Sequence, residues 1–476
     1  MNVTGKDLVA LLPLLILAAT AVVVMLAVAV HRSHAVSAAL TLVGLAISFG
    51  SLWIAGPQLP RQVTPLLVLD GYALFYTGLI LAAGMVFVLL AYGYFEKFED
   101  DHDELYILML VATLGSAVLV SSSHFVSLFL GLELLSVALY GMIAYPRHRP
   151  LPLEAGIKYL VLAAVSAAFL LFGMALIYGA LGTMQFDEIG ARLTRTDFDR
   201  WLVLPGMALI VTGFGFKLAV VPFHLWTPDV YEGAPAPVAG YIATVSKGAM
   251  FALLLRYFYR TAAHELAPLF LLFSIIAIAS MFAGNILALL QKNVKRILAY
   301  SSIAHLGYLL VAFQASGDLA PTAVAFYLVA YFVTTLGAFG VVGVLSDDTE
   351  DADSLEAYKG LFWRRPVVGG IFTAMLFSLA GIPVTAGFIG KFYVVAAGAS
   401  AAMWGLVIIL VITSAIGLFY YLRIVVAMYS EAGQVKAAPA IAQPETWVLI
   451  FLSASLVFLG LFPQPLLELI RNLARG

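Results

Sequence analysis

Long apolar stretches recur along the whole chain, and short polar segments separate them. A helix that crosses about 30 Å of hydrocarbon needs about 20 apolar residues. The stretches at 70–93 and 105–121 show no strand-like alternation, so a β-barrel is a poor alternative. The pattern predicts an all-α polytopic membrane protein with about fourteen transmembrane helices. We place them near 8–31, 35–54, 70–93, 105–121, 123–145, 154–181, 201–222, 237–259, 266–289, 295–314, 321–345, 366–398, 402–430 and 446–470.

The polar segments between these spans are too short to hold a folded soluble domain. The first apolar stretch starts late, runs long and lacks a small-residue cleavage site, so we expect a retained helix. Lys and Arg are divided almost evenly between the two sets of loops, with a slight excess that favours both termini outside.

Composition agrees with a lipid environment. Hydrophobic residues make up 63% of the 476 residues and charged residues only 11%, against about 25% charged in soluble domains. This excludes an ordinary soluble enzyme and a disordered protein, and the net charge of −2 gives no sign of nucleic-acid binding. The chain has no cysteine, so disulfides, thiolate catalysis and iron–sulfur clusters are excluded on it. We expect no cofactor on this chain, and any electron transfer would occur on a partner.

Four ionisable residues interrupt the apolar spans: Glu133, Lys217, Lys247 and Lys391. Each charge at the middle of a membrane costs roughly 2.5–3.5 kcal/mol, so such residues usually have a function. A structural ion pair, or a lysine whose amine reaches the interface, is the alternative. Burial lowers the proton affinity of a lysine and raises that of a carboxylate. The set therefore predicts a proton relay.

Further polar residues lie near the same spans. Glu154 and Lys158 are four residues apart near the start of a helix and can pair on one face. Lys295 lies at a span start and could reach inward. His224 and His305 could bridge lysines that are too far apart to exchange protons. We find no spacing of metal ligands and expect no metal site.

Two spans are broken by helix-disrupting residues. Pro222 and Pro228 follow Lys217, and Pro383 precedes Lys391. A break inside a membrane frees backbone groups that must face protein or water.

The two breaks share the pattern Gly-Phe-x-x-Lys, at 213–217 and 387–391, about five spans apart. An odd number of spans per repeat gives two units of opposite direction, as in many transporters. We predict two inverted five-helix repeats, each with a broken helix. The predicted units are N-terminal helices at 1–104, repeat one at 105–260, repeat two at 266–430 and a C-terminal helix at 431–476.

Two motifs carry a family resemblance. The run FHLWTPDVYEGAPAP at 223–237 and the run SSIAHLGY at 301–308 resemble signatures of the antiporter-like, proton-translocating subunits of respiratory complex I. The resemblance covers essentially the whole chain. Within the family, the chain most resembles subunit N of bacterial NADH–quinone oxidoreductase. Another member has a glutamate where this chain has Lys391.

The resemblance implies a function for each matching position. Glu133 and Lys217 would form the coupling pair of the first half-channel, Lys247 would be the central lysine, and Lys391 would be the terminal lysine of the second half-channel. Supporting residues would be Glu154, Lys158, His224, Lys295 and His305. The chain would sit in a bacterial inner membrane among other complex I subunits. NADH, FMN, iron–sulfur clusters and quinone would bind those partners.

Two alternatives remain at this point. One is a subunit of a multi-subunit sodium/proton antiporter, which shares the fold, although lysines outnumber carboxylates along the predicted axis. The other is a membrane scaffold whose buried charges are structural.

Overall fold

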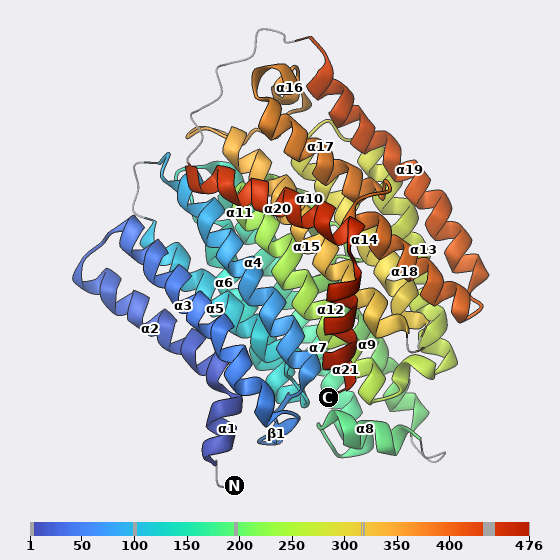
Figure 1. Ribbon diagram of the computed structural model, residues 1–476. Helices are drawn as coiled ribbons and strands as arrows, with labels where there is room; N and C mark the ends of the chain where they lie inside the picture. Colours follow the sequence, from blue (N-terminus) through green and yellow to red (C-terminus); the bar gives the residue numbers. More distant parts are fainter. Residues whose placement is uncertain are drawn as a thin grey trace.

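The computed structural model describes residues 4–98, 102–194, 199–315, 317, 319–431 and 443–475, and helices dominate it (Figure 1). Within these residues, thirteen helices are long and apolar enough to cross a membrane. They are α2 (Leu12–Val30), α3 (His34–Ala55), α4 (Gly71–Phe95), α5 (Asp103–Val120), α6 (Phe125–Ile143), α7 (Pro150–Leu181), α9 (Arg200–Leu218), the continuous α11 (Ala236–Tyr241), η2 (Ile242–Ser246) and α12 (Lys247–Arg260), α13 (Ala267–Leu289), α14 (Val294–Gln314), α15 (Leu319–Leu345), α19 (Trp404–Tyr429) and α20 (Gln443–Leu461).

Two shorter apolar helices, α17 (Pro366–Ala380) and α18 (Ala386–Ser400), together form an interrupted fourteenth span. The predicted all-α membrane fold is therefore confirmed. The remaining elements are short: α1 (Gly5–Ala10), η1 (Gly56–Gln58), β1 (Arg61–Val63), β2 (Leu67–Leu69), α8 (Phe186–Leu193), α10 (Trp226–Gly233), η3 (Ala263–Glu265), η4 (Leu355–Tyr358), α16 (Leu361–Arg364) and α21 (Gln464–Arg475).

Both chain ends lie on one side of the bundle, because an even number of spans returns the chain to its starting side. Figure 1 shows the two ends at the bottom, with α1, β1 and α8, and α16 at the top. We call these the terminal side and the opposite side. The strands β1 and β2 pair as a small antiparallel hairpin.

The spans from α5 to α19 form two sets of five. The first set is α5, α6, α7, the α9–α10 pair and the α11–α12 helix; the second is α13, α14, α15, the α17–α18 pair and α19. Five crossings separate α5 from α13, so the two sets run in opposite directions. The fourth member of each set is interrupted, as predicted.

The breaks follow from left-handed residues at the helix ends. Ala219 ends α9 with a φ of 59°, and Gly381 ends α17 with a φ of 84°. A left-handed residue turns the chain out of the helix. Lys217 precedes its break, whereas Lys391 follows its own, so the shared Gly-Phe-x-x-Lys pattern does not mark equivalent positions.

The glycines of that pattern explain why the same sequence pattern occurs at two positions that are not structurally equivalent. A Cβ at Gly213 would lie 2.8 Å from the Leu170 side chain, and one at Gly387 would lie 1.9 Å from the Ser378 carbonyl oxygen. Each glycine permits a close approach to a neighbouring helix. A short match therefore arises from packing needs at two different places.

The helices α12, α14 and α15 form the centre of the bundle. Nearly all of their membrane-length windows are buried, whereas α2, α7 and α20 lie mostly at the surface. Polar side chains on the three central helices therefore need partners inside the protein. This requirement decides where the candidate site lies.

We expect Gly387→Ala to disturb the second break. The added methyl would meet the Ser378 backbone, and overpacking of this kind costs about 1–3 kcal/mol. Gly370→Ala is the matched control, because no atom lies within 4 Å of its Cβ position. That control should be neutral or stabilising by up to about 1 kcal/mol. Thermal unfolding midpoints in detergent would compare the two, and equal midpoints would contradict this account of the break.

Candidate functional site

Lys217 lies in the last turn of α9 and is almost completely buried. Its amine donates a hydrogen bond to Ser136 Oγ at 2.7 Å and another to the Tyr159 hydroxyl at 3.3 Å. The Tyr159 ring centroid lies 5.0 Å from the amine. The first broken helix therefore places an ammonium between hydroxyl groups of α6 and α7.

Lys247 begins α12, directly after the π-helical turn η2, and it is also buried. Its amine donates to Ser302 Oγ at 2.8 Å, and the Tyr331 hydroxyl donates to the same oxygen at 2.7 Å. Repeat two supplies both hydroxyls, from α14 and α15. The central lysine of repeat one thus relies on the other repeat for its partner.

The half-helix α10 connects the surroundings of these two lysines. The Trp226 indole N–H donates to the carbonyl of Phe216 at the end of α9. Its ring lies 4.8 Å from the Tyr159 ring, and the Lys247 amine lies 6.0 Å from the Trp226 ring centroid. The Lys247 amine is also 5.1 Å from the ring of Tyr231. Movement of α10 would therefore change the environment of both lysines.

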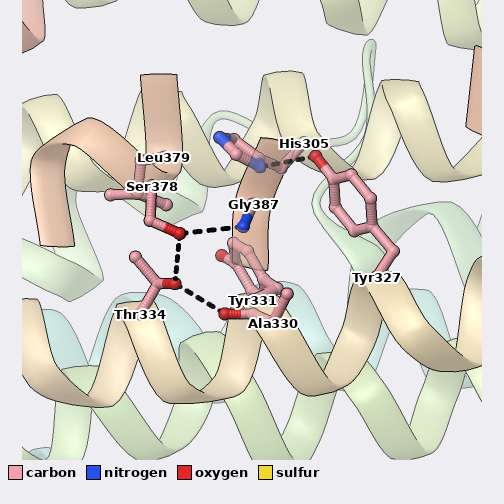
Figure 2. Close-up of a pocket in the computed structure, with 8 residues that line it drawn as sticks. All are labelled: His305, Tyr327, Ala330, Tyr331, Thr334, Ser378, Leu379 and Gly387. Carbon is pink, nitrogen blue, oxygen red and sulfur yellow. Dashed lines mark hydrogen bonds between the residues drawn. The ribbon is translucent and has the colours of Figure 1, made fainter. Parts of the chain in front are cut away.

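His305 continues the row of polar groups into repeat two. It is hydrogen-bonded with the Tyr327 hydroxyl at 2.7 Å and the Tyr421 hydroxyl at 3.2 Å. Figure 2 shows residues that line a small cavity, among them His305, Tyr331, Ser378 and Gly387. The cavity volume of about 10 Å³ is close to what a single water needs.

Lys391 lies on α18, the half-helix that follows the second break. Its amine donates to the carbonyls of Leu379 and Ala380 at 2.9 and 2.8 Å, and to Ser414 Oγ at 2.8 Å. These carbonyls belong to the end of α17 and are freed by the break. Leu379 also lines the cavity, so the cavity adjoins both His305 and the turn that binds the Lys391 amine.

Glu133 is only partly buried, on α6. It exerts an electrostatic attraction on Lys217, but among the described residues no ion pair joins the two. Its helix exposes Leu130, Leu134 and Val137 to the outside of the bundle. Glu133 therefore lies between the Lys217 amine and the outer surface of the subunit.

The predicted pairing of Glu154 with Lys158 is confirmed, at 2.6 Å. Lys158 also pairs with Asp229 of α10 at 2.9 Å, and the other oxygen of that carboxylate accepts from Arg296 of α14 at 2.9 Å. Glu232 accepts from Arg296 as well, at 2.6 Å. Glu154, Lys158, Asp229 and Glu232 of this network line a cavity of about 80 Å³ on the opposite side. In the described part of the chain, no hydrogen bond joins the network to the amines of Lys217, Lys247 or Lys391.

The two remaining predicted residues take different places. Lys295 is buried at the start of α14, where its amine is bound by Asp351 and by two carbonyls of the α10 end. His224 is buried in the segment between α9 and α10. In the described part of the chain, no hydrogen bond or ring contact joins His224 to Lys217 or Lys247.

Sequence reasoning did not identify the hydroxyl groups that hold the amines: Ser136, Tyr159, Ser302 and Ser414. One signal was available, because Ser136 lies three residues after Glu133 on the same helix. Serine and tyrosine are common in apolar helices, so their identity alone does not mark a site.

The comparison with protein families matches residues 122–417 to the family described as NADH:quinone oxidoreductase/Mrp antiporter, transmembrane. The match covers more than half of the chain, including Glu133, Lys217, Lys247 and Lys391. The chain belongs to this family. It is a multi-pass, antiporter-like membrane subunit, and the predicted resemblance is confirmed at this level.

Solved structures agree with this family. A chain of respiratory complex I from Thermus thermophilus, solved with bound aureothin, is 34% identical, with 96% of this chain and 98% of that chain covered and a TM-score of 0.83. A chain of the Mrp complex from Dietzia sp. DQ12-45-1b has a TM-score of 0.87 at 20% identity, with 98% and 97% covered. A chain of the membrane-bound sulfane sulfur reductase, an archaeal respiratory membrane complex, has a TM-score of 0.83 at 22% identity, with 98% and 96% covered. The last two show a shared fold.

We expect Ser302→Ala to destabilise the subunit by about 1–3 kcal/mol, because the buried Lys247 amine and the Tyr331 hydroxyl both lose their partner. Ser302→Thr keeps the hydroxyl and should retain most of the stability. Thr212→Val is a control, because the Thr212 hydroxyl is exposed and bonds only within its own helix turn in the described structure. Equal unfolding midpoints for Ser302→Ala and Thr212→Val would contradict the assigned contact.

Proposed function

We propose that this antiporter-like subunit carries protons along a row of buried groups from Lys217 to Lys391. The observation that carries the proposal is the sequence of contacts across both repeats. Lys247 and Tyr331 meet at Ser302, the Tyr331 ring lies 5.4 Å from the His305 ring, and the cavity beside His305 reaches the Leu379 turn that holds Lys391.

The physical basis is that the amines of these lysines are hydrogen-bonded to neutral groups and not to a carboxylate. A buried lysine that is bound by hydroxyls and carbonyls, with no direct carboxylate, gains or loses a proton more readily than one in a tight ion pair. Hydroxyl groups both donate and accept, so Ser302 and Tyr331 can pass a proton between neighbours. A water in the cavity would complete the link to Lys391.

The proposed control of the row is electrostatic. Glu133 attracts Lys217 from the outer side, so a change at Glu133 alters how firmly Lys217 holds its proton. Moving one charge across 100 mV requires about 2.3 kcal/mol. Two charges brought to about 4 Å interact by about 4 kcal/mol at an effective dielectric of 20, so forming an ion pair between Glu133 and Lys217, which the described residues do not show, would change their interaction by up to about this amount. A rearrangement of this one pair is therefore of the right size to drive a transfer.

We further propose that the chain serves as subunit N of an NADH–quinone oxidoreductase in a bacterial inner membrane. The 34% identity to a chain of Thermus complex I supports this assignment. Electron transfer from NADH through FMN and iron–sulfur clusters to quinone would take place on partner subunits. The chain would then act as a translocase without redox chemistry of its own.

A cation/proton antiporter subunit of the Mrp type is the second candidate, because the fold of a Dietzia Mrp chain matches over nearly the whole length. A sodium site needs oxygen ligands, and lysine amines occupy the positions along the row. Proton transport that depends on electron donor and quinone, and is unchanged without sodium, would favour the redox complex. Transport that requires sodium and no quinone would favour the antiporter.

We expect Lys217→Ala and Lys247→Ala to reduce proton transport through this subunit by about tenfold or more, because removing a positioned proton carrier slows a transfer step by about 10²–10⁴. The assay is quinone-linked proton uptake by the complex in vesicles. Lys292→Ala is the control, because Lys292 is an exposed lysine beside α14. Full proton transport in both test variants would reject the relay and would favour the alternative that the subunit is a scaffold with structural charges.

A further inference from the structure

Lys295 differs from the other buried lysines in how tightly it is bound. Its amine donates to Asp351 Oδ2 at 2.6 Å and to the backbone carbonyls of Glu232 and Ala234 at 2.7 and 2.6 Å. Three acceptors match the three N–H groups of an ammonium. One acceptor is a buried carboxylate, so every N–H of the amine is used to hold a neighbouring segment. A group held in this way is a poor proton carrier.

The two carbonyls belong to the C-terminal end of α10, which is the half-helix of repeat one. The last carbonyls of a helix have no partner within the helix and attract cations. The neighbouring Arg296 binds side chains of α10, because its guanidinium donates hydrogen bonds to the carboxylates of Asp229 and Glu232. Two consecutive residues of α14 therefore bind α10: Lys295 binds its backbone carbonyls and Arg296 binds its carboxylates.

Asp351 lies in the segment of repeat two between α15 and α17. Besides Lys295, it accepts a hydrogen bond from the Tyr94 hydroxyl of α4 at 2.5 Å, and the Arg149 guanidinium lies 3.7 Å away. These partners come from the N-terminal helices and from repeat one. The Asp351 side chain is only 8% exposed, and it joins three parts of the chain at one point.

The segment around Asp351 is itself fixed to the start of α14. Val294 donates to the Asp353 carbonyl, Leu355 donates to the Lys292 carbonyl, and the Asn293 side chain donates to the Asp353 carboxylate at 2.5 Å. Burial raises the pKa of Asp353, although the charge of Lys295 acts in the other direction. Asp353 thus anchors the segment, and Asp351 is the ion-pair partner of Lys295.

We propose that Lys295 and Asp351 form a clamp between the repeats that positions α10, and that Lys295 does not carry protons. α10 places Trp226 and Tyr231 beside Lys217 and Lys247, so the clamp sets the environment of both lysines. The inference rests on the proposed proton transport for its consequence, but the position of α10 can be measured without any transport assay. Lys295 and Asp351 are positioning residues in this scheme.

The position of α10 can be read with a thiol probe, because the chain has no cysteine. Thr227→Cys places a thiol on α10 at a fully buried position. The probe is a small methanethiosulfonate reagent, and the labelled chain is separated from its partner subunits and quantified by mass. Asp351→Asn should increase the labelling rate about tenfold, because the released α10 end exposes the site.

Glu356→Gln is the matched control for this change. Glu356 lies in the same segment, but it is exposed and pairs with Lys359 at 2.6 Å. It loses the same charge without touching α10, so its labelling rate should equal that of the parent. An unchanged labelling rate in Asp351→Asn would overturn the clamp.

Lys295→Arg separates the clamp from a relay. Arginine keeps the charge and several N–H donors, but it does not release its proton in proteins. If Lys295 acts only as a clamp, Lys295→Arg should leave the Thr227→Cys thiol slowly labelled and should leave proton transport unchanged. Slow labelling with abolished transport would identify Lys295 as a carrier and overturn the proposal. If the relay itself is wrong, Lys217→Ala transports normally while the Asp351→Asn labelling result still stands.

Discussion

The structure depends on one constraint, which is that a polar group inside an apolar bundle must find its partner within the protein. No water competes for it in the hydrocarbon region, and an unpaired buried charge is strongly unfavourable. The buried amines described here each have an oxygen within hydrogen-bonding distance, and these oxygens come from neighbouring helices. The positions of the helices and the positions of the charges are therefore set together.

The two broken helices meet this constraint in different ways. At the first break, the freed carbonyl of Phe216 is taken by the Trp226 indole, so Lys217 relies on hydroxyls of α6 and α7. At the second break, the carbonyls at the end of α17 remain available and hold Lys391 directly. The helix end also carries partial negative charge. The two terminal amines therefore rest in unlike environments, one among hydroxyl groups and the other at a helix end.

The repeats depend on each other at two levels. In the centre, Lys247 of repeat one is held by Ser302 of repeat two. At the opposite side, Lys295 and Arg296 of repeat two hold α10 of repeat one. Both contacts use α14, whose first turn lies at the edge of the bundle and whose middle lies at the core. A rigid helix of this kind can carry a displacement at the edge to the central lysine, because its residues keep fixed spacing.

The sequence by itself determined the membrane class, the approximate spans, the two breaks and the four costly charges. Those features depend on local composition, such as apolar length, proline and glycine positions, and a charge in an apolar run. The pairing of Glu154 with Lys158 was also local, because four residues make one helical turn. The tertiary structure alone decided that Glu133 and Lys217 form no ion pair in the described part of the chain, that Ser302 holds Lys247, and that Asp351 holds Lys295. These partners are far apart in the chain and common in type, so no spacing rule identifies them. Only the packing of the central helices, under the demand that each buried polar group be satisfied, selects among them.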